Sequence, residues 1–152
     1  MSNNMSALGD NEKYEALSIE WVDAMRRHVT EKAIGKPLDF EVVFSIEYTD
    51  PPQHLLRGKG DASVGYTIRV KNGVLEVLDG AHPEEADVGT CAAYDPFALS
   101  YRLPLDQYMR FLQDERPKLE AEGKVKRYGN PELIKPLVPV IEMLGFYSKY
   151  TA

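Results

Sequence analysis

Hydrophobic and polar residues alternate through the middle of the chain, first over residues 40–48 and again over residues 64–70. A period of two sends successive side chains to opposite faces of a β-strand, so both runs are predicted to be half-buried strands. Asn72 and Gly73 follow the second run and favour a tight hairpin turn into residues 74–78. The pattern therefore predicts an antiparallel strand pair around this turn.

Two further segments are predicted to be strands. Residues 86–93 combine small and β-branched side chains, which favours a strand that leaves space beside the sheet. A short run over residues 124–128 ends at Gly129. Since the predicted strands occupy the middle of the chain and the predicted helices lie toward its ends, the order of elements favours an α+β fold.

The N-terminal region carries apolar residues at spacings of three and four, which predicts an amphipathic helix from Asp10 to about Lys32. Such a stripe is expected to pack on the sheet, with Trp21 as its largest anchor; a helix that docks on a partner is the alternative. The positions that form the stripe are Tyr14, Leu17, Trp21, Met25 and Val29.

The C-terminal region predicts a helix that starts after Asn130, which can cap it, with Pro131 in its first turn. Pro136 and Pro139 fall inside the apolar pattern, and each is expected to kink or interrupt the helix. A kinked cover packs less closely and leaves room for a ligand. The apolar positions are Leu133, Ile134, Leu137, Val138, Ile141, Met143 and Leu144.

Two other segments are predicted to be helical. Residues 97–103 follow an Asp95–Pro96 pair that favours a helix start, although their apolar residues also alternate as in a strand, and both interpretations stay open. Residues 105–112 place Leu105, Tyr108, Met109 and Leu112 on one helical face. Residues 114–122 are highly charged and are expected to be solvated.

The segment 49–60 is a loop by its proline and glycine content, yet it carries Leu55 and Leu56 next to Arg57. One interpretation is a surface loop that folds its leucines inward. The other is a lid or a tip that touches a membrane, because an apolar pair beside basic residues suits an interface.

Composition restricts the class of protein. The 152 residues are expected to form one domain over residues 10–152, after a disordered leader at residues 1–9. The 18 basic and 24 acidic residues give a net charge of −6 without a basic cluster, which argues against nucleic acid as a partner. A single cysteine, Cys91, forms no internal disulfide, and the sequence shows no signal peptide or membrane span; these features predict a cytoplasmic protein.

The sequence contains no phosphate-binding glycine loop, metal-ligand spacing or nucleophile elbow, so no cofactor, metal or catalytic residue is predicted. His28, His54 and His82 are each expected at the surface, and Cys91 is expected to be a small buried residue. Nine tyrosines and five phenylalanines are more informative, because such residues can line a pocket for an apolar body with one polar end.

Three segments together resemble the sterol carrier protein type two family, also called non-specific lipid-transfer proteins. They are the Asn72–Gly73 hairpin at residues 66–77, the Glu85-Ala-Asp-Val opening of the next strand, and the Gly-Lys-Val-Lys-Arg-Tyr-Gly segment at residues 123–129 that leads into the last helix. The resemblance covers roughly residues 40–144. It implies a mainly antiparallel sheet of about five strands, covered by helices on one face, with an apolar tunnel between them.

The resemblance also implies that the protein binds or transfers a fatty acyl chain, an acyl-CoA, a sterol or a similar lipid, and that it is not an enzyme. From the patterns above, the expected cover consists of Leu133, Leu137, Val138, Ile141 and Leu144. One wall is expected from Phe97, Leu99, Tyr101, Tyr108, Met109 and Leu112, and the sheet side from Phe44, Ile46, Tyr66 and Ile68.

Two other functions remain open from the sequence. The same apolar surface suits an interaction or accessory module that docks on an enzyme acting on hydrophobic substrates, with a membrane surface or a second copy of the chain as further partners. A small α+β enzyme is a third alternative, although no acid, base or nucleophile constellation supports it.

Overall fold

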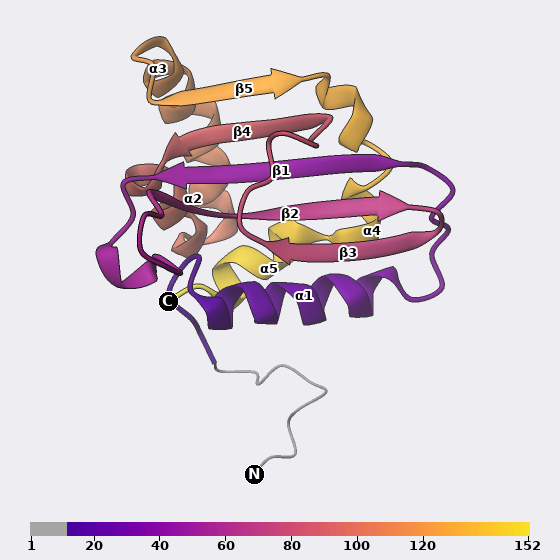
Figure 1. The fold of residues 1–152 in the computed structure, drawn as a ribbon. Helices are drawn as coiled ribbons and strands as arrows, with labels where there is room; N and C mark the ends of the chain where they lie inside the picture. Colours follow the sequence, from indigo (N-terminus) through magenta and orange to yellow (C-terminus); the bar gives the residue numbers. More distant parts are fainter. Residues whose placement is uncertain (1–11) are drawn as a thin grey trace.

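A single five-stranded sheet organises the chain. The computed structural model describes residues 12–152, and its strands are β1 (Val42–Thr49), β2 (Ser63–Lys71), β3 (Val74–Asp79), β4 (Val88–Ala93) and β5 (Val125–Gly129) (Figure 1). Their spatial order is β3-β2-β1-β4-β5. The β1–β4 pair is parallel and the other three pairs are antiparallel, which confirms the predicted α+β fold with a mainly antiparallel sheet.

The hairpin between β2 and β3 forms where the sequence predicts it. Asn72 and Gly73 have φ values of 52° and 75°, so both central residues adopt the left-handed conformation that a tight two-residue hairpin turn requires. Lys71 pairs with Val74, and this turn fixes the register of the two strands. As a result Tyr66 and Ile68 project toward the helices, on the same face as Ile46 of β1.

The opposite face of the sheet is covered by the segment that links β3 to β4, which crosses β1 and β2 (Figure 1). The backbone N–H of Asp87 donates to the carbonyl oxygen of Val43 at 2.8 Å, and the Thr67 hydroxyl donates to that of Gly80 at 3.0 Å. The hydroxyl of buried Ser45 accepts from the His82 N–H at 2.9 Å. The link brings the chain back to the end of the sheet at which β1 begins. β4 therefore runs parallel to β1.

The N-terminal helix α1 spans Ile19–Ala33 and is capped by the Ser18 hydroxyl, which accepts from the Trp21 N–H at 3.1 Å. The predicted earlier start is wrong for the described part of the chain. Tyr14 instead pairs with the end of the chain, donating its N–H to the Tyr150 carbonyl, and Leu17 has a φ of 66°. Tertiary pairing thus overrides helical periodicity there. The proposed cap Asp10 and the proposed leader lie outside the described residues.

Helical turns also connect β4 to β5. The turns η3 (Tyr94–Ala98) and η4 (Leu99–Arg102) resolve the open choice for residues 97–103 in favour of helix. The helix α2 (Leu105–Arg110) then continues through η5 (Phe111–Glu115) into α3 (Arg116–Ala121), so the charged segment forms a mainly exposed helix. We call residues 94–121 the helical arm, which rises behind β4 and β5 in Figure 1.

The loop between β1 and β2 contains a short turn, η2 (Gln53–Leu55), in which Leu55 is buried. Arg57 fastens the loop by donating to the Leu17 carbonyl oxygen at 2.8 Å and to the Asp79 carboxylate. The loop therefore folds Leu55 inward, as in the first of the two interpretations above. None of the described helices is both long and apolar enough to cross a bilayer.

The C-terminal segment is divided into three helical pieces, η6 (Pro131–Ile134), α4 (Val138–Ile141) and α5 (Met143–Tyr150). The predicted interruption around Pro136 and Pro139 is confirmed, because each proline lacks the N–H that a continuous helix needs. Glu142, with a φ of 46°, turns the chain between α4 and α5. The three pieces therefore present their apolar residues in different directions.

Substitution Asn130→Ala is expected to reduce the free energy of unfolding by about 1 kcal/mol, because the Asn130 side chain accepts a hydrogen bond from the Glu132 N–H at 3.0 Å at the start of η6. Urea denaturation of the wild type and the variant measures this change. Asn130→Ser, which preserves an accepting oxygen, is the control and should lose less. Equal stability of Asn130→Ala and the wild type would contradict the capping role.

His28 is buried against the C-terminal segment, so its expected surface position is wrong. It lies on the apolar face of α1, and its Nε2–H reaches the carbonyl oxygens of Ile141 at 3.0 Å and Glu142 at 3.1 Å. Burial lowers the pKa of the imidazole below its ordinary value of 6.5, despite these two carbonyls.

This lowered pKa predicts a loss of stability at acid pH. The unfolded chain binds the His28 proton more tightly than the folded protein, so stability is complete above pH 6.5 and decreases as the pH falls below that value. We expect His28→Gln, whose amide can still donate to a carbonyl, to decrease less between about pH 6.5 and pH 5. Thermal unfolding at a series of pH values measures both slopes; parallel slopes would contradict a neutral buried His28.

Candidate functional site: a cavity between sheet and helices

A cavity of about 540 Å³ lies between the sheet and the helices that cover it. Its floor is the helix-facing side of four strands, formed by Phe44, Ile46, Tyr48, Tyr66, Val88, Thr90, Ala92, Val125 and Arg127. Its walls come from the helical arm and the C-terminal segment, with Phe97, Ser100, Tyr101, Tyr108, Leu112, Arg116, Glu120, Pro131, Ile134 and Tyr147. The cavity therefore lies where the sequence predicts a ligand between sheet and cover.

Small side chains on β4 help to create this space. Val88, Thr90 and Ala92 stand opposite Phe44, Ile46 and Tyr48 of β1 and face the helices. A strand with larger residues at these three places would fill much of the volume. The expectation that this strand leaves space beside the sheet thus agrees with the geometry.

The inner part of the cavity holds a cluster of tyrosines whose hydroxyl groups meet. The Tyr101 hydroxyl is hydrogen-bonded to that of Tyr48 and lies 3.4 Å from that of Tyr66, which lies 3.2 Å from that of Tyr147. The rings of Tyr101 and Tyr147 stack with centroids 4.0 Å apart, and the Tyr108 ring lies 5.6 Å from Tyr147. We call these five residues, Tyr48, Tyr66, Tyr101, Tyr108 and Tyr147, the phenol cluster.

Burial keeps the phenol cluster uncharged. Removal from water raises the pKa of Tyr48, Tyr66, Tyr101 and Tyr147 well above 10, and raises the pKa of Tyr108 to about 12. At neutral pH these groups are hydrogen-bond donors and acceptors rather than bases. The cavity is therefore apolar along most of its walls and carries hydroxyl groups in one region.

Charged residues stand at the opposite side, near the edge strand β5. The Arg127 guanidinium donates from Nε and Nη2 to the two carboxylate oxygens of Glu120, each at 3.1 Å. Their side chains are 49% and 37% exposed, so solvent screens the pair and it contributes little to stability. Arg116 also borders the cavity there, and these three residues form its polar rim.

Seven of the fifteen predicted site residues border the cavity: Phe44, Ile46, Tyr66, Phe97, Tyr101, Tyr108 and Leu112. The other eight lie elsewhere. Ile68, Leu137 and Ile141 are buried in the core, Leu99 is half-buried, and Met109, Leu133, Val138 and Leu144 are exposed. The C-terminal segment faces the cavity through Pro131, Ile134 and Tyr147 instead, because its division into three pieces changes which residues share a face.

Some lining residues had a signal in the sequence and others had none. Tyr48 continues the alternation of Phe44 and Ile46, so the same period of two identifies it. Arg116 and Glu120 belong to the segment that was expected to be solvated, and Arg127 to a predicted strand. Only the packing of the helical arm against β5 brings the three to one rim.

The serine and the cysteine nearest the cavity are hydrogen-bonded or turned away from it. Among the described residues that line it there is no histidine or cysteine, and the Ser100 hydroxyl donates to the Phe97 carbonyl oxygen at 2.6 Å. Cys91, predicted to be buried, is only half-buried and points to the opposite face of the sheet, where partial burial raises the pKa of its thiol.

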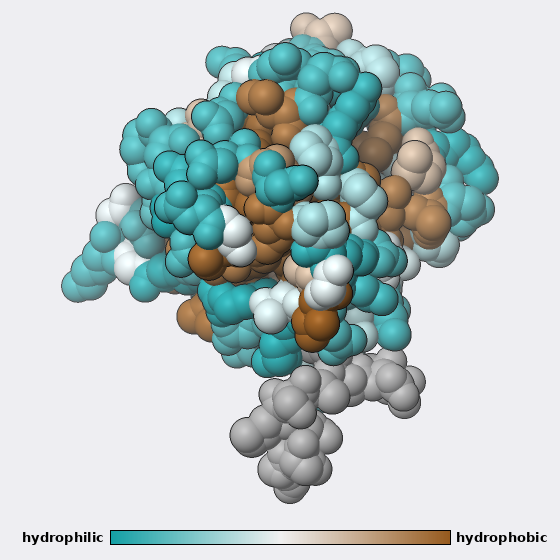
Figure 2. All heavy atoms as spheres, turned by 90° about the vertical axis from the view of Figure 1, so that its right-hand side faces the viewer, coloured by the Kyte–Doolittle hydropathy of each residue, from teal (hydrophilic) through white to brown (hydrophobic). Residues whose placement is uncertain are grey.

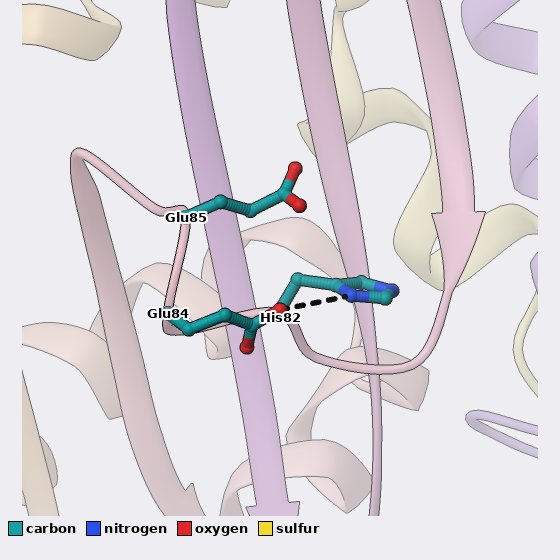
Figure 3. A group of neighbouring side chains, drawn as sticks. All are labelled: His82, Glu84 and Glu85. Atoms are coloured by element: carbon teal, nitrogen blue, oxygen red, sulfur yellow. Dashed lines mark ion pairs between the residues drawn. The ribbon is translucent and has the colours of Figure 1, made fainter.

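A second group of polar side chains lies on the outer face, where His82, Glu84 and Glu85 approach one another in the crossing segment (Figure 3). The His82 Nδ1 is 3.5 Å from a Glu84 carboxylate oxygen, while Glu85 is paired with Arg69. The Arg69 guanidinium lowers the pKa of Glu85. Since one of the three potential ligands already has a cationic partner, the group is explained as a surface ion-pair network.

Comparison with known proteins gives matches among solved structures only; no family model and no curated protein matches the chain. A conserved hypothetical protein from Thermus thermophilus, described as possibly a sterol carrier protein, has 15% identity and a TM-score of 0.49, over 96% of this chain and 97% of that one. The sterol carrier protein domain 2 of Helicoverpa armigera has 14% identity and a TM-score of 0.48, over 96% and 98%.

A crystal structure of sterol carrier protein 2 has 12% identity and a TM-score of 0.49, over 91% of this chain and 100% of that one. Solved structures similar to this chain thus include sterol carrier proteins, as the sequence resemblance predicted.

Proposed function

We propose that this protein binds an apolar small molecule without covalent chemistry, in the cavity between the sheet and the C-terminal segment, and serves as its carrier. The observation that supports the proposal is the cavity itself, whose volume of about 540 Å³ lies within the roughly 300–1,000 Å³ of typical ligand sites. Its aromatic and aliphatic walls favour a fatty acyl chain, an acyl-CoA, a sterol or a similar lipid.

The hydrophobic effect is sufficient for such binding. Transfer of about ten methylenes from water into the cavity gains roughly 8 kcal/mol, which corresponds to about micromolar affinity before the cost of ordering the ligand. Phe44, Ile46, Phe97 and Leu112 would contact the apolar body of the ligand.

Native mass spectrometry of the protein as purified, followed by organic extraction, tests the proposal. We expect an adduct of one small molecule per chain that organic solvent releases and that belongs to an apolar chemical class. A protein that carries no adduct, and that also takes up neither fluorescent fatty-acid nor sterol probes, would overturn the proposal.

One observation favours a second function, that of an accessory module docking on an enzyme that acts on hydrophobic substrates. Leu133, Val138 and Leu144 of the C-terminal segment are 41%, 53% and 43% exposed. Figure 2, seen from the side where α4 lies in Figure 1, shows hydrophobic side chains between hydrophilic ones. The same mass spectra distinguish the two functions, because a docking module would appear with a protein partner or a second copy and without a small-molecule adduct.

A further inference from the structure

The hydroxyl groups of the phenol cluster have more donors than the described residues use. Tyr48, Tyr101, Tyr66 and Tyr147 form a chain of four hydroxyl groups joined by three hydrogen bonds. Each hydroxyl can donate one proton and also accept, so these groups keep hydrogen-bonding capacity beyond the three bonds. The Tyr108 hydroxyl borders the cavity and makes no hydrogen bond within residues 12–152, so it is a free donor there.

The free donor is not sealed in the core, since Arg27 Nε is the one buried side-chain polar atom without a partner among the described residues. A donor that borders the cavity can give its hydrogen to an acceptor that enters with a ligand. Most of the cavity wall nearby is apolar, with the Trp21 ring stacked on Tyr101 at a centroid distance of 5.6 Å. The most direct way to satisfy the cluster is therefore a group that arrives with the ligand.

The register of the sheet gives the backbone separation between Tyr66 of the cluster and Arg127 of the polar rim. Arg127 pairs with Thr90, Thr90 with Ile46, and Ile46 with Tyr66, so one row of neighbours crosses the floor from the rim to the cluster. Three strand spacings separate the ends of this row, roughly 14 Å. A ligand that lies along the row meets hydroxyl groups at one end, apolar floor in the middle and charged side chains at the other end.

We propose that the bound molecule places an uncharged oxygen, a carbonyl or hydroxyl, against the phenol cluster and extends its apolar body along this row toward Arg127. The inference rests on the proposed function and specifies it, because it states which end of the ligand lies deepest. A simple fatty acid that inserts its methyl end would leave the free Tyr108 donor without an acceptor. The cationic side chains that line the cavity, Arg116 and Arg127, belong to the polar rim, and of the cluster residues Tyr108 is the one whose pKa Arg116 affects; a carboxylate is therefore better balanced at the rim than beside Tyr66.

Two ligands of equal chain length, 2-dodecanone and dodecane, test this orientation. The affinity of each is measured by its displacement of a fluorescent dye bound in the cavity. The decisive variant replaces all five tyrosines of the cluster with phenylalanine, which preserves ring packing and removes every hydroxyl. We expect this variant to bind 2-dodecanone roughly tenfold more weakly than the wild type, because the carbonyl loses its donors. Its affinity for dodecane should stay within about twofold.

Tyr108→Phe alone should produce part of the ketone effect with no cost to the fold, because its hydroxyl has no hydrogen-bond partner among the described residues. Tyr14→Phe is the matched control, since the Tyr14 hydroxyl contacts Glu12 outside the cavity. A second measurement needs no variant: the infrared carbonyl stretch of bound 2-dodecanone should move to lower frequency relative to the ketone in an alkane solvent.

The outcomes separate the two proposals. If the cluster variants weaken ketone and alkane equally, and the carbonyl frequency matches that in alkane, the inference is overturned and water satisfies the phenols, while the proposed function stands. If neither compound displaces the dye from the wild type, the proposed function itself fails.

Discussion

Substitution Thr90→Trp is expected to weaken ligand binding by roughly a hundredfold or more. Thr90 lies in the middle of the cavity floor, between Ile46 and Arg127 in the register, and its side chain faces the helices. An indole there would occupy the path of the ligand, and excluding only four methylenes removes about 3 kcal/mol of binding free energy. Calorimetric titration with a ligand identified by extraction measures the loss.

The fold should tolerate this substitution, because the added ring occupies existing space rather than a filled core; any strain is expected to stay near the low end of the roughly 1–3 kcal/mol typical of overpacking. Lys126→Trp is the matched control, since Lys126 is exposed and points away from the cavity on the neighbouring strand. Affinity of Thr90→Trp equal to that of the control would mean that the ligand lies elsewhere.

Substitution Trp21→Ala is expected to lower the free energy of unfolding by about 3–5 kcal/mol. Trp21 is fully buried and its ring contacts Tyr66, Tyr101 and Phe146, with centroid distances of 5.4–5.8 Å. Alanine would leave a large void and would also remove the donor that reaches the Thr151 hydroxyl at 2.9 Å. Urea denaturation measures the change.

Two further variants check the physical reason. Trp21→Phe retains much of the ring contact and should lose clearly less, whereas Ile34→Ala, at a side chain that is 75% exposed, should stay within about 0.5 kcal/mol of the wild type. Because Trp21 supports Tyr101, the alanine variant is also expected to loosen the phenol cluster and weaken ligand binding. A loss below about 1 kcal/mol would contradict the central role of Trp21 in the core.

Local signals in the sequence located most of the strands and several helix ends. The alternation around Ile46 and Ile68 identified two strands and the face that each buries, and Asn72 with Gly73 determined the turn between β2 and β3. Asn130 correctly marked the beginning of the C-terminal segment. These features depend on neighbours within a few residues, so the sequence is sufficient to predict them.

Where long-range contacts compete, the sequence was misleading. Tyr14 fits the helical stripe of α1, but its backbone pairs with Thr151 at the other end of the chain. His28 has the polarity of a surface residue, yet the carbonyls of Ile141 and Glu142 satisfy its ring inside the protein. In the C-terminal segment, Leu133 and Val138 fit one helical face only if the helix is continuous, and the turn at Glu142 and the two prolines prevent this.

The sequence by itself thus determined the class of fold, the hairpin, the small residues of β4 and the apolar character of the candidate site, because each depends on local periodicity or side-chain size. Only the tertiary structure decided which aromatic residues share the cavity. Tyr48, Tyr66, Tyr101 and Tyr147 come from four separate elements, and no spacing along the chain relates them. Their hydroxyl groups meet because sheet register and helix packing act over long sequence separations, and that meeting defines the polar end of the proposed ligand site.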